Sequence, residues 1–138
     1  MQAKIFALPF VLLILVSCAN PSRPIPSHTL AITPVPSGKS VVILLHGWGG
    51  DETETWGQLP GYLDEALRQR DMYVRTYSYP SGIIGDIPAI DQIVQNLDEG
   101  LNQHCNDAHE YIFVAHSMGG LVAKEYILSY LRRGQSYK

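Results

Sequence analysis

The chain has 138 residues, and 13 acidic and 10 basic side chains give it a formal net charge of −3. This balance excludes the strongly basic surface of a nucleic-acid-binding domain, so we expect no nucleic acid among the partners. The length fits a single domain with one hydrophobic core.

The first seventeen residues have the pattern of a secretion signal. Lys4 supplies a positive charge, and an apolar run follows from Ile5 to Val16. The run is shorter than the roughly 20 residues that a membrane-spanning helix needs, and Pro9 interrupts it. We therefore predict a signal peptide at residues 1–17.

Residues 15–18, Leu-Val-Ser-Cys, resemble the end of a bacterial lipoprotein signal, which is cut before a cysteine that then carries lipid. The resemblance implies that Cys18 is the lipid-attachment residue and that its acyl chains hold the protein in the membrane of the bacterial cell envelope. Ala19 is not acidic, which favours the outer membrane if the cell is Gram-negative. The open alternative is a cysteine that merely ends an ordinary signal peptide.

Residues 18–39 have the composition of a tether. Five prolines lie between Ala19 and Lys39, together with Ser and Thr. Such a composition favours extended backbone at about 3.1 Å per residue, so it could hold a domain up to roughly 60 Å from a lipidated Cys18.

The following residues, 40–138, alternate between strand and helix patterns. Apolar and β-branched runs predict strands at 40–46, 72–79 and 111–115. Apolar residues at helical spacing predict helices at 58–70, 88–103 and 118–133. Strands that alternate with helices pair in parallel through right-handed crossovers, so the predicted class is α/β with a three-stranded parallel sheet.

The segment Ala115-His116-Ser117-Met118-Gly119 links the third predicted strand to the third predicted helix. A serine nucleophile needs this setting, because a sharp turn exposes its hydroxyl to a base and to backbone N–H groups. Ala115 stands where the G-x-S-x-G pattern has its first glycine, and Gly119 matches the second. Ser117 is therefore the candidate nucleophile, whereas His116 is expected to be a structural neighbour.

The first predicted strand ends in His46-Gly47-Trp48-Gly49-Gly50, about 70 residues before Ser117. This loop and the serine turn together resemble the α/β-hydrolase superfamily, especially its lipase-like and serine-esterase members, over residues 40–133. The resemblance implies hydrolysis of an acyl ester or a related small or lipid substrate. Ser117 would be the nucleophile, and the backbone N–H groups of Trp48 and Met118 would form the oxyanion hole. His46 would order the oxyanion loop.

Two patterns could indicate a cofactor or metal site, but each lacks residues that such a site needs. Gly47-Trp48-Gly49 could begin a dinucleotide fingerprint, but Glu52 replaces the third glycine and would repel a pyrophosphate. His104 and Cys105 are too few for a zinc site. We expect no nucleotide cofactor, no other cofactor and no metal ion, and Cys105 to be inert.

The acid and base of the catalytic triad are missing from the expected place. In the superfamily they follow the serine, on loops after later strands. After Ser117 this chain has Glu125 as its only acid, on the following helix, and no histidine. We therefore predict the N-terminal part of the hydrolase fold, truncated before its acid and base and nearly inactive, with the nucleophile strand at the sheet edge.

Two alternatives stay open at the sequence level. The half-fold could serve as a non-enzymatic, lipid-anchored interaction module, or an active hydrolase could use His104 or His109 as an unusual base. The substrate is also open among lipids, small esters, peptides and thioesters, and acyl transfer could replace hydrolysis.

Overall fold

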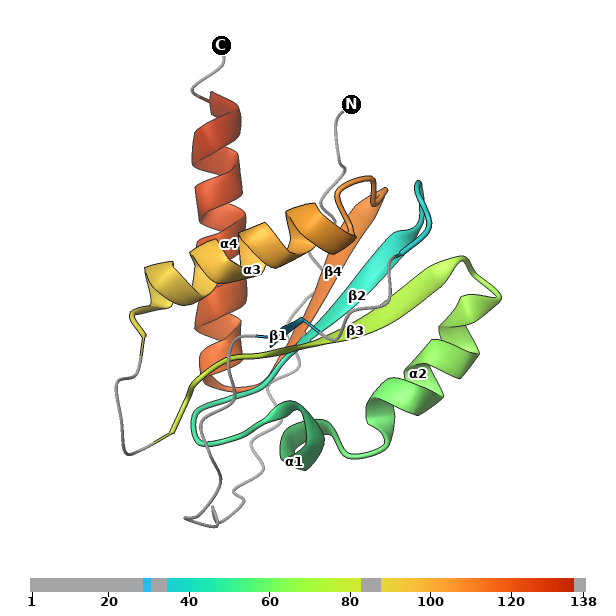
Figure 1. The fold of residues 1–138 in the computed structure, drawn as a ribbon, viewed down its shortest axis with the longest axis horizontal. Helices are drawn as coiled ribbons and strands as arrows, with labels where there is room; N and C mark the ends of the chain where they lie inside the picture. Colours follow the sequence, from blue (N-terminus) through green and yellow to red (C-terminus); the bar gives the residue numbers. More distant parts are fainter. Residues whose placement is uncertain (1–28, 31–34, 83–87, 136–138) are drawn as a thin grey trace.

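The computed structural model describes residues 29–30, 35–82 and 88–135. They form a twisted sheet with helices packed against it (Figure 1). The signal peptide expected at residues 1–17 and the lipid-attachment residue Cys18 lie outside the described residues. Among the helices described, none is long and apolar enough to cross a membrane.

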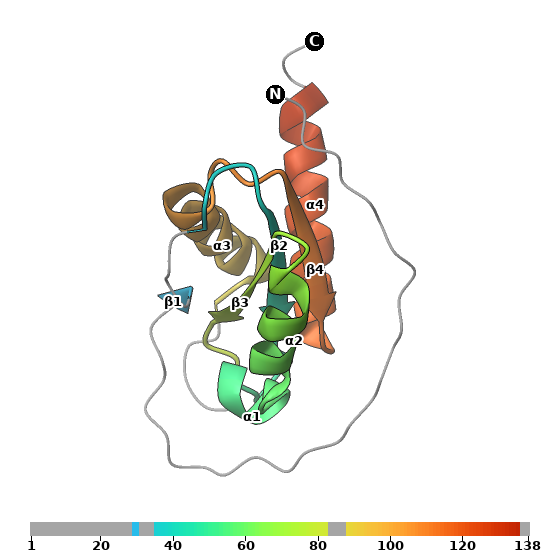
Figure 2. The same cartoon turned by 90° about the vertical axis from the view of Figure 1, so that its right-hand side faces the viewer.

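The sheet in the described part of the chain has four strands in the order β1-β3-β2-β4, which Figure 2 shows from left to right. They are β1 (Thr29–Leu30), β2 (Ser40–Leu45), β3 (Met72–Ser78) and β4 (Glu110–Ala115). Strand β2 pairs in parallel with β3 and β4, whereas β1 pairs antiparallel with β3. The predicted α/β class and the three parallel strands are confirmed, and β4, the strand that precedes Ser117, is the outer strand of this sheet.

In the described part of the chain, four helices connect and cover the strands: α1 (Glu52–Trp56), α2 (Leu59–Arg68), α3 (Ile90–His104) and α4 (Met118–Gln135). The three helices expected from apolar spacing are present. The short α1 was not predicted. It forms because the Asp51 side chain accepts hydrogen bonds from the N–H groups of Thr53 and Glu54, both at 2.7 Å.

Strand β2 is the centre of the core, because its side chains are buried on both faces of the sheet. Val41, Ile43 and Leu45 pack with α3 and α4, and Val42 and Leu44 pack with α2 on the opposite face. This double burial is the reason that the strand reads as a continuous apolar run.

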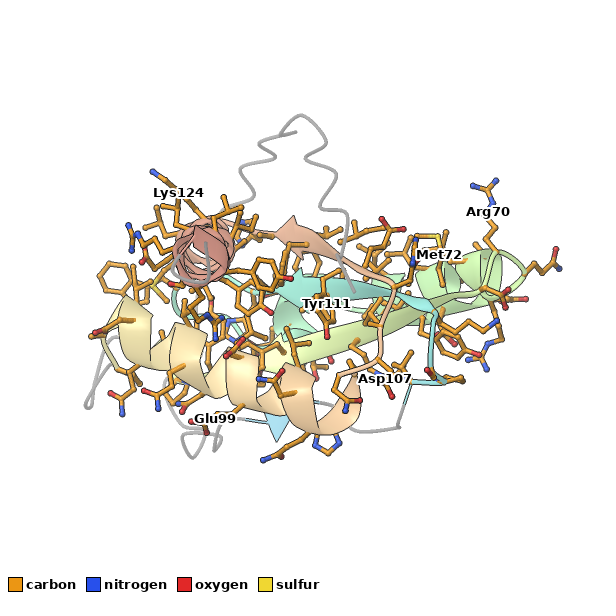
Figure 3. All side chains as sticks on the ribbon, turned by 90° about the horizontal axis from the view of Figure 1, so that it is seen from above. Arg70, Met72, Glu99, Asp107, Tyr111 and Lys124 are labelled. Carbon is orange, nitrogen blue, oxygen red and sulfur yellow. The ribbon has the colours of Figure 1, made fainter. Side chains whose placement is uncertain are left out.

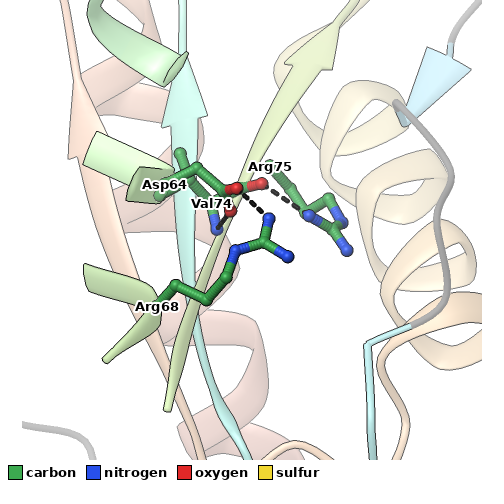
Figure 4. Close-up of polar contacts among 4 residues, drawn as sticks. All are labelled: Asp64, Arg68, Val74 and Arg75. Atoms are coloured by element: carbon green, nitrogen blue, oxygen red, sulfur yellow. Dashed lines mark hydrogen bonds and ion pairs between the residues drawn. The ribbon is translucent and has the colours of Figure 1, made fainter. Parts of the chain in front are cut away.

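Polar contacts of Asp64 join helix α2 to β3 (Figure 4). The Asp64 carboxylate accepts hydrogen bonds from the Arg68 guanidinium and, at 3.5 Å, from the N–H of Val74. The bond from Arg68 is the main reason that the pKa of Asp64 is lowered. These contacts fix where β3 begins relative to α2.

Helices α3 and α4 are joined to each other and to β4. Arg133 on α4 donates two hydrogen bonds to the Asp98 carboxylate on α3, at 2.7 and 3.1 Å. Tyr111 lies between β4 and α3 (Figure 3), where its hydroxyl donates to the carbonyl oxygen of Cys105 at 2.6 Å. Together these contacts fix the direction in which α4 leaves the serine turn.

Part of the segment expected to be a tether is attached to the domain. Thr29 pairs with Ser78 of β3, and the N–H of Val35 donates to the carbonyl oxygen of His104 at 3.3 Å. The N–H of Gly38 donates to the carbonyl oxygen of Asp107 at 2.8 Å. The described parts of this segment therefore contact the last residues of β3 at Thr29 and Leu30, and the end of α3 and the loop after it at Val35 and Gly38.

Candidate active site

Ser117 occupies a strained turn between β4 and α4. Its φ angle is +51°, in the left-handed region that a side chain with a Cβ atom seldom adopts. Such strain persists only where the surrounding structure imposes it, and it is typical of a nucleophile on a strand-to-helix turn. The residue is exposed, so its hydroxyl is accessible.

Backbone hydrogen bonds fix this turn to the end of β2. The N–H of His116 donates to the carbonyl oxygen of Leu45 at 2.9 Å. Within the turn, the N–H groups of Gly119 and Gly120 donate to the carbonyl oxygens of His116 and Ser117, at 3.0 and 2.9 Å. The position of Ser117 is thus set by the most buried strand of the domain.

Gly119 allows α4 to begin directly against β2. A Cβ atom placed there would overlap the carbonyl oxygen of Leu45 and would lie 2.7 Å from that of His46. Both oxygens belong to the backbone at the end of the central strand, so they cannot shift without distorting that strand. Only glycine fits this position without displacing the turn.

The loop after β2 lies against the serine turn. A Cβ atom on Gly47 would lie 2.8 Å from Nδ1 of His116 and 2.9 Å from Cβ of Ser117. A residue just after β3 also holds this loop in place. The N–H of Gly49 donates a hydrogen bond to the carbonyl oxygen of Ser81 at 2.6 Å. Two segments about 70 residues apart in sequence therefore meet beside the serine.

This contact brings together the segments that carry the predicted oxyanion-hole residues. Met118 is the first residue of α4, so its N–H has no acceptor within the helix and lies at the positive end of the helix dipole. Trp48 follows Gly47 in the packed loop, and its side chain is 61% exposed. Two such backbone N–H groups beside a serine are what stabilisation of an oxyanion requires.

His46 orders the loop through both of its ring nitrogens. Nε2 accepts a hydrogen bond from the N–H of Tyr79 at 3.2 Å, so the proton lies on Nδ1, which donates to the carbonyl oxygen of Gly47 at 3.0 Å. The Tyr79 ring stacks on the imidazole at 4.1 Å, and its hydroxyl donates to the carbonyl oxygen of His46. Burial lowers the pKa of His46. The ring is a neutral structural support.

Tyr79 and Ser81 are residues that the sequence interpretation missed. Both follow the end of β3, the neighbour of β2, and both are buried against the loop. The available signal was their position: carboxyl ends of adjacent parallel strands lie at the same edge of a sheet.

His104 and His109 lie at the end of the sheet where the parallel strands begin, whereas Ser117 lies where these strands end. His104 ends α3, and His109 immediately precedes β4, with its N–H bonded to the carbonyl oxygen of Lys39 at 2.9 Å. The six residues of β4 separate His109 from the serine turn by about 20 Å. The alternative in which His104 or His109 activates Ser117 is therefore wrong for this fold.

The sequence also singled out Glu125, His116 and Cys105, and the structure shows the surroundings of each. Glu125 accepts a hydrogen bond from Arg132 at 3.1 Å, as expected for a residue on the surface of α4. Nδ1 of His116 is buried against Gly47 without a hydrogen-bond partner in the described residues. Cys105 is buried, which raises the pKa of its thiol. Within residues 35–82 and 88–135, no three potential metal ligands gather.

Comparison with known protein families agrees with this geometry. The model of the alpha/beta hydrolase family matches residues 42–135, from β2 to the end of α4. The chain belongs to the alpha/beta hydrolase family. No curated protein and no solved structure is similar enough to the chain to count as a match. The matched residues include both the loop after β2 and the serine turn. They correspond to the N-terminal part of the hydrolase fold.

Gly119→Ala should destabilise the hydrolase domain and displace Ser117. The added methyl group meets two backbone oxygens, and overpacking of this kind costs about 1–3 kcal/mol in the free energy of unfolding. The matched control is Gly134→Ala on the same helix, where a Cβ atom has no neighbour within 4 Å and alanine favours helix. Urea denaturation of the two variants measures the difference. Equal stability would contradict the close approach of α4 to β2.

The buried imidazole of His46 predicts a loss of stability in mild acid. Its pKa is lowered from the ordinary value of 6.5, so the unfolded chain takes up this proton at a higher pH than the folded chain. Its contribution is complete above about pH 6.5 and is lost as the pH falls toward the folded pKa, with a slope of at most about 1.4 kcal/mol per pH unit. Urea denaturation between pH 7 and pH 5 should show a shallower decline for His46→Gln.

The control for this measurement is His109→Gln, which removes an exposed histidine far from the loop. It should retain the pH dependence of the unmodified chain. If His46→Gln shows the same slope as His109→Gln, His46 does not titrate as a buried neutral group.

Proposed function

We propose that the chain is the nucleophile-bearing part of a lipid-anchored serine hydrolase that cleaves carboxylic esters or related acyl compounds. The observation that carries the proposal is the strained, exposed Ser117 at the junction of β4 and α4. Its contact with Gly47 adds the second segment that acyl transfer needs. The family supports hydrolase chemistry in general, and these two features favour a serine mechanism.

The reaction proceeds through an acyl-enzyme. The Ser117 oxygen attacks the acyl carbonyl while a base takes its proton, and the N–H groups of Trp48 and Met118 bind the resulting oxyanion. The tetrahedral intermediate expels the alcohol, which takes up the proton, and leaves the acyl group on the serine. Water then attacks the same carbonyl as the base takes one of its protons. The bond between the acyl carbon and the Ser117 oxygen breaks, the serine oxygen takes back that proton, and the carboxylic acid leaves.

The acid and base of this mechanism come from polypeptide other than the described residues. His46 is occupied by Gly47 and Tyr79, and His104 and His109 lie at the far edge. Strand β4 is the outer strand of the described sheet, so its open edge can pair with a further strand that brings these groups to Ser117. Attachment through a lipidated Cys18 would hold the hydrolase in the bacterial cell envelope, at the outer membrane if the cell is Gram-negative.

The second candidate is a non-enzymatic interaction module. The observation in its favour is the same outer strand, because β4 is only partly buried and Val114 is 37% exposed. In this alternative the edge binds another chain and Ser117 performs no chemistry. Reactivity at Ser117 separates the two candidates.

A fluorophosphonate probe tests the proposed nucleophile and the missing base together. Because the described residues bring no base to Ser117, its hydroxyl must lose its proton to hydroxide, so the labelling rate of the full chain should rise about tenfold per pH unit from pH 7 to pH 9. Added imidazole should accelerate the labelling because it supplies a general base. Mass spectrometry of the labelled peptide measures the rate and the site.

Two variants control this experiment. Ser117→Ala should abolish the labelling, whereas Ser129→Ala, on the fourth turn of α4, should label like the unmodified chain. A labelling rate that levels off above pH 7 would show that the chain carries its own base, and would overturn the proposal that the base comes from other polypeptide. No labelling at Ser117 even at pH 9 would overturn the nucleophile and favour the interaction module.

A further inference from the structure

Exposed apolar side chains lie on the three segments that meet near Ser117: the loop after β2, the end of β4 and the start of α4. Trp48 follows β2, Val114 is the penultimate residue of β4, and Leu121 lies in the first turn of α4. They are 61%, 37% and 54% exposed. We call these three side chains the apolar rim. Because they flank the end of the strand that leads to the serine, the rim lies at the edge of the sheet where the reaction would occur.

The register of β1 shows where the preceding chain joins the domain. Thr29 pairs with Ser78, the last residue of β3, and Leu30 pairs with Tyr77. Because β3 is parallel to β2 and β4, its last residue lies at the same edge of the sheet as the serine turn. The chain therefore enters the domain at the edge that carries the apolar rim and Ser117, and not at the edge where β2 begins.

Chain length then limits how far this edge can lie from a lipidated Cys18. Ten residues, 19–28, lie between Cys18 and Thr29, and even a fully extended chain spans at most about 40 Å over these eleven residue-to-residue steps. If the connection reached the domain only at Ser40, where β2 begins, the lipid would be tethered to the opposite edge. The β1 pairing thus shortens the connection and moves it to the side of the active site.

Charge indicates what kind of surface the rim can meet. Asp51, Glu52 and Glu54 lie at the same edge, at the start of α1. They would repel strongly anionic lipid, so attraction must come from the apolar side chains and the anchor rather than from charge. A tryptophan at the margin of an exposed apolar surface suits the boundary between headgroups and acyl chains.

We propose that this edge of the sheet faces the lipid bilayer, with the apolar rim in contact with it, so that Ser117 receives acyl substrates from the membrane. This inference rests on the proposed function for its chemistry and on Cys18 for its anchor. It names the substrate class as membrane-borne acyl lipids, in preference to soluble esters, because the pairing of β1 with β3 and the apolar rim both lie at the edge where the substrate must enter.

Quenching of tryptophan fluorescence by brominated lipid tests the orientation directly. The full lipidated chain carries Trp56→Phe, so Trp48 is its only tryptophan. It is placed in phosphatidylcholine vesicles containing a brominated phosphatidylcholine. The comparison protein combines Trp48→Phe, Trp56→Phe and Leu131→Trp, since Leu131 is 50% exposed near the other end of α4. Emission from Trp48 should fall at least about twice as much as emission from the Leu131→Trp protein.

A matched pair of leucines on α4 provides the control for the rim. Leu121→Ser should reduce the quenching of Trp48, because it removes an apolar contact with the bilayer, whereas Leu131→Ser should leave it unchanged. Partial replacement of phosphatidylcholine by phosphatidylglycerol should also reduce the quenching. Circular dichroism verifies that each variant is folded.

Each contrary outcome has a distinct meaning. Equal quenching at the two positions, or stronger quenching in the Leu131→Trp protein, would overturn the orientation. A concentration-dependent shift of Trp48 emission without bromine quenching would show that the rim binds a second copy of the chain, and would also overturn it. Ser117 labelling is read separately: labelling without quenching overturns only the membrane orientation, whereas quenching without labelling overturns the hydrolase chemistry.

Discussion

The arrangement of this site depends on the close approach of α4 to the end of β2. Gly119 lies against the carbonyl oxygens of Leu45 and His46, and the N–H of His116 bonds to the first of them. These contacts press the serine turn onto the central strand. The left-handed conformation of Ser117 follows, because the chain must reverse from β4 into α4 within this short distance.

The same strand end positions the opposing loop. His46 is buried at the end of β2, and its imidazole is locked between the backbone of Tyr79 and that of Gly47. Since the ring has no free nitrogen for catalysis, its contribution is to hold the loop rigid. A rigid loop beside a rigid turn keeps two N–H groups in fixed positions, which is how an oxyanion is stabilised without reorganisation.

Much of the fold was predictable because its signals are local. The order of residues alone reveals the buried run from Val41 to Leu45 and the apolar stripes of α2, α3 and α4. The turn at Ser117 was recognisable because small residues flank a serine between strand and helix. Its role as nucleophile stays a prediction.

The missed features depend on contacts that sequence order does not display. Helix α1 has no apolar repeat and is stabilised by the Asp51 cap. Strand β1 is two residues long and forms only because β3, about 50 residues later, offers an open edge. The stacking of Tyr79 on His46 likewise requires the order of the strands to be known.

A crystal structure of the phosphonylated chain would test the central claim most directly, since the adduct on Ser117 mimics the tetrahedral intermediate. We expect a phosphonyl oxygen about 3 Å from the backbone nitrogens of both Trp48 and Met118, with the turn and the loop after β2 in their present positions. An adduct oxygen that faces solvent, with neither nitrogen in reach, would contradict the proposed oxyanion hole.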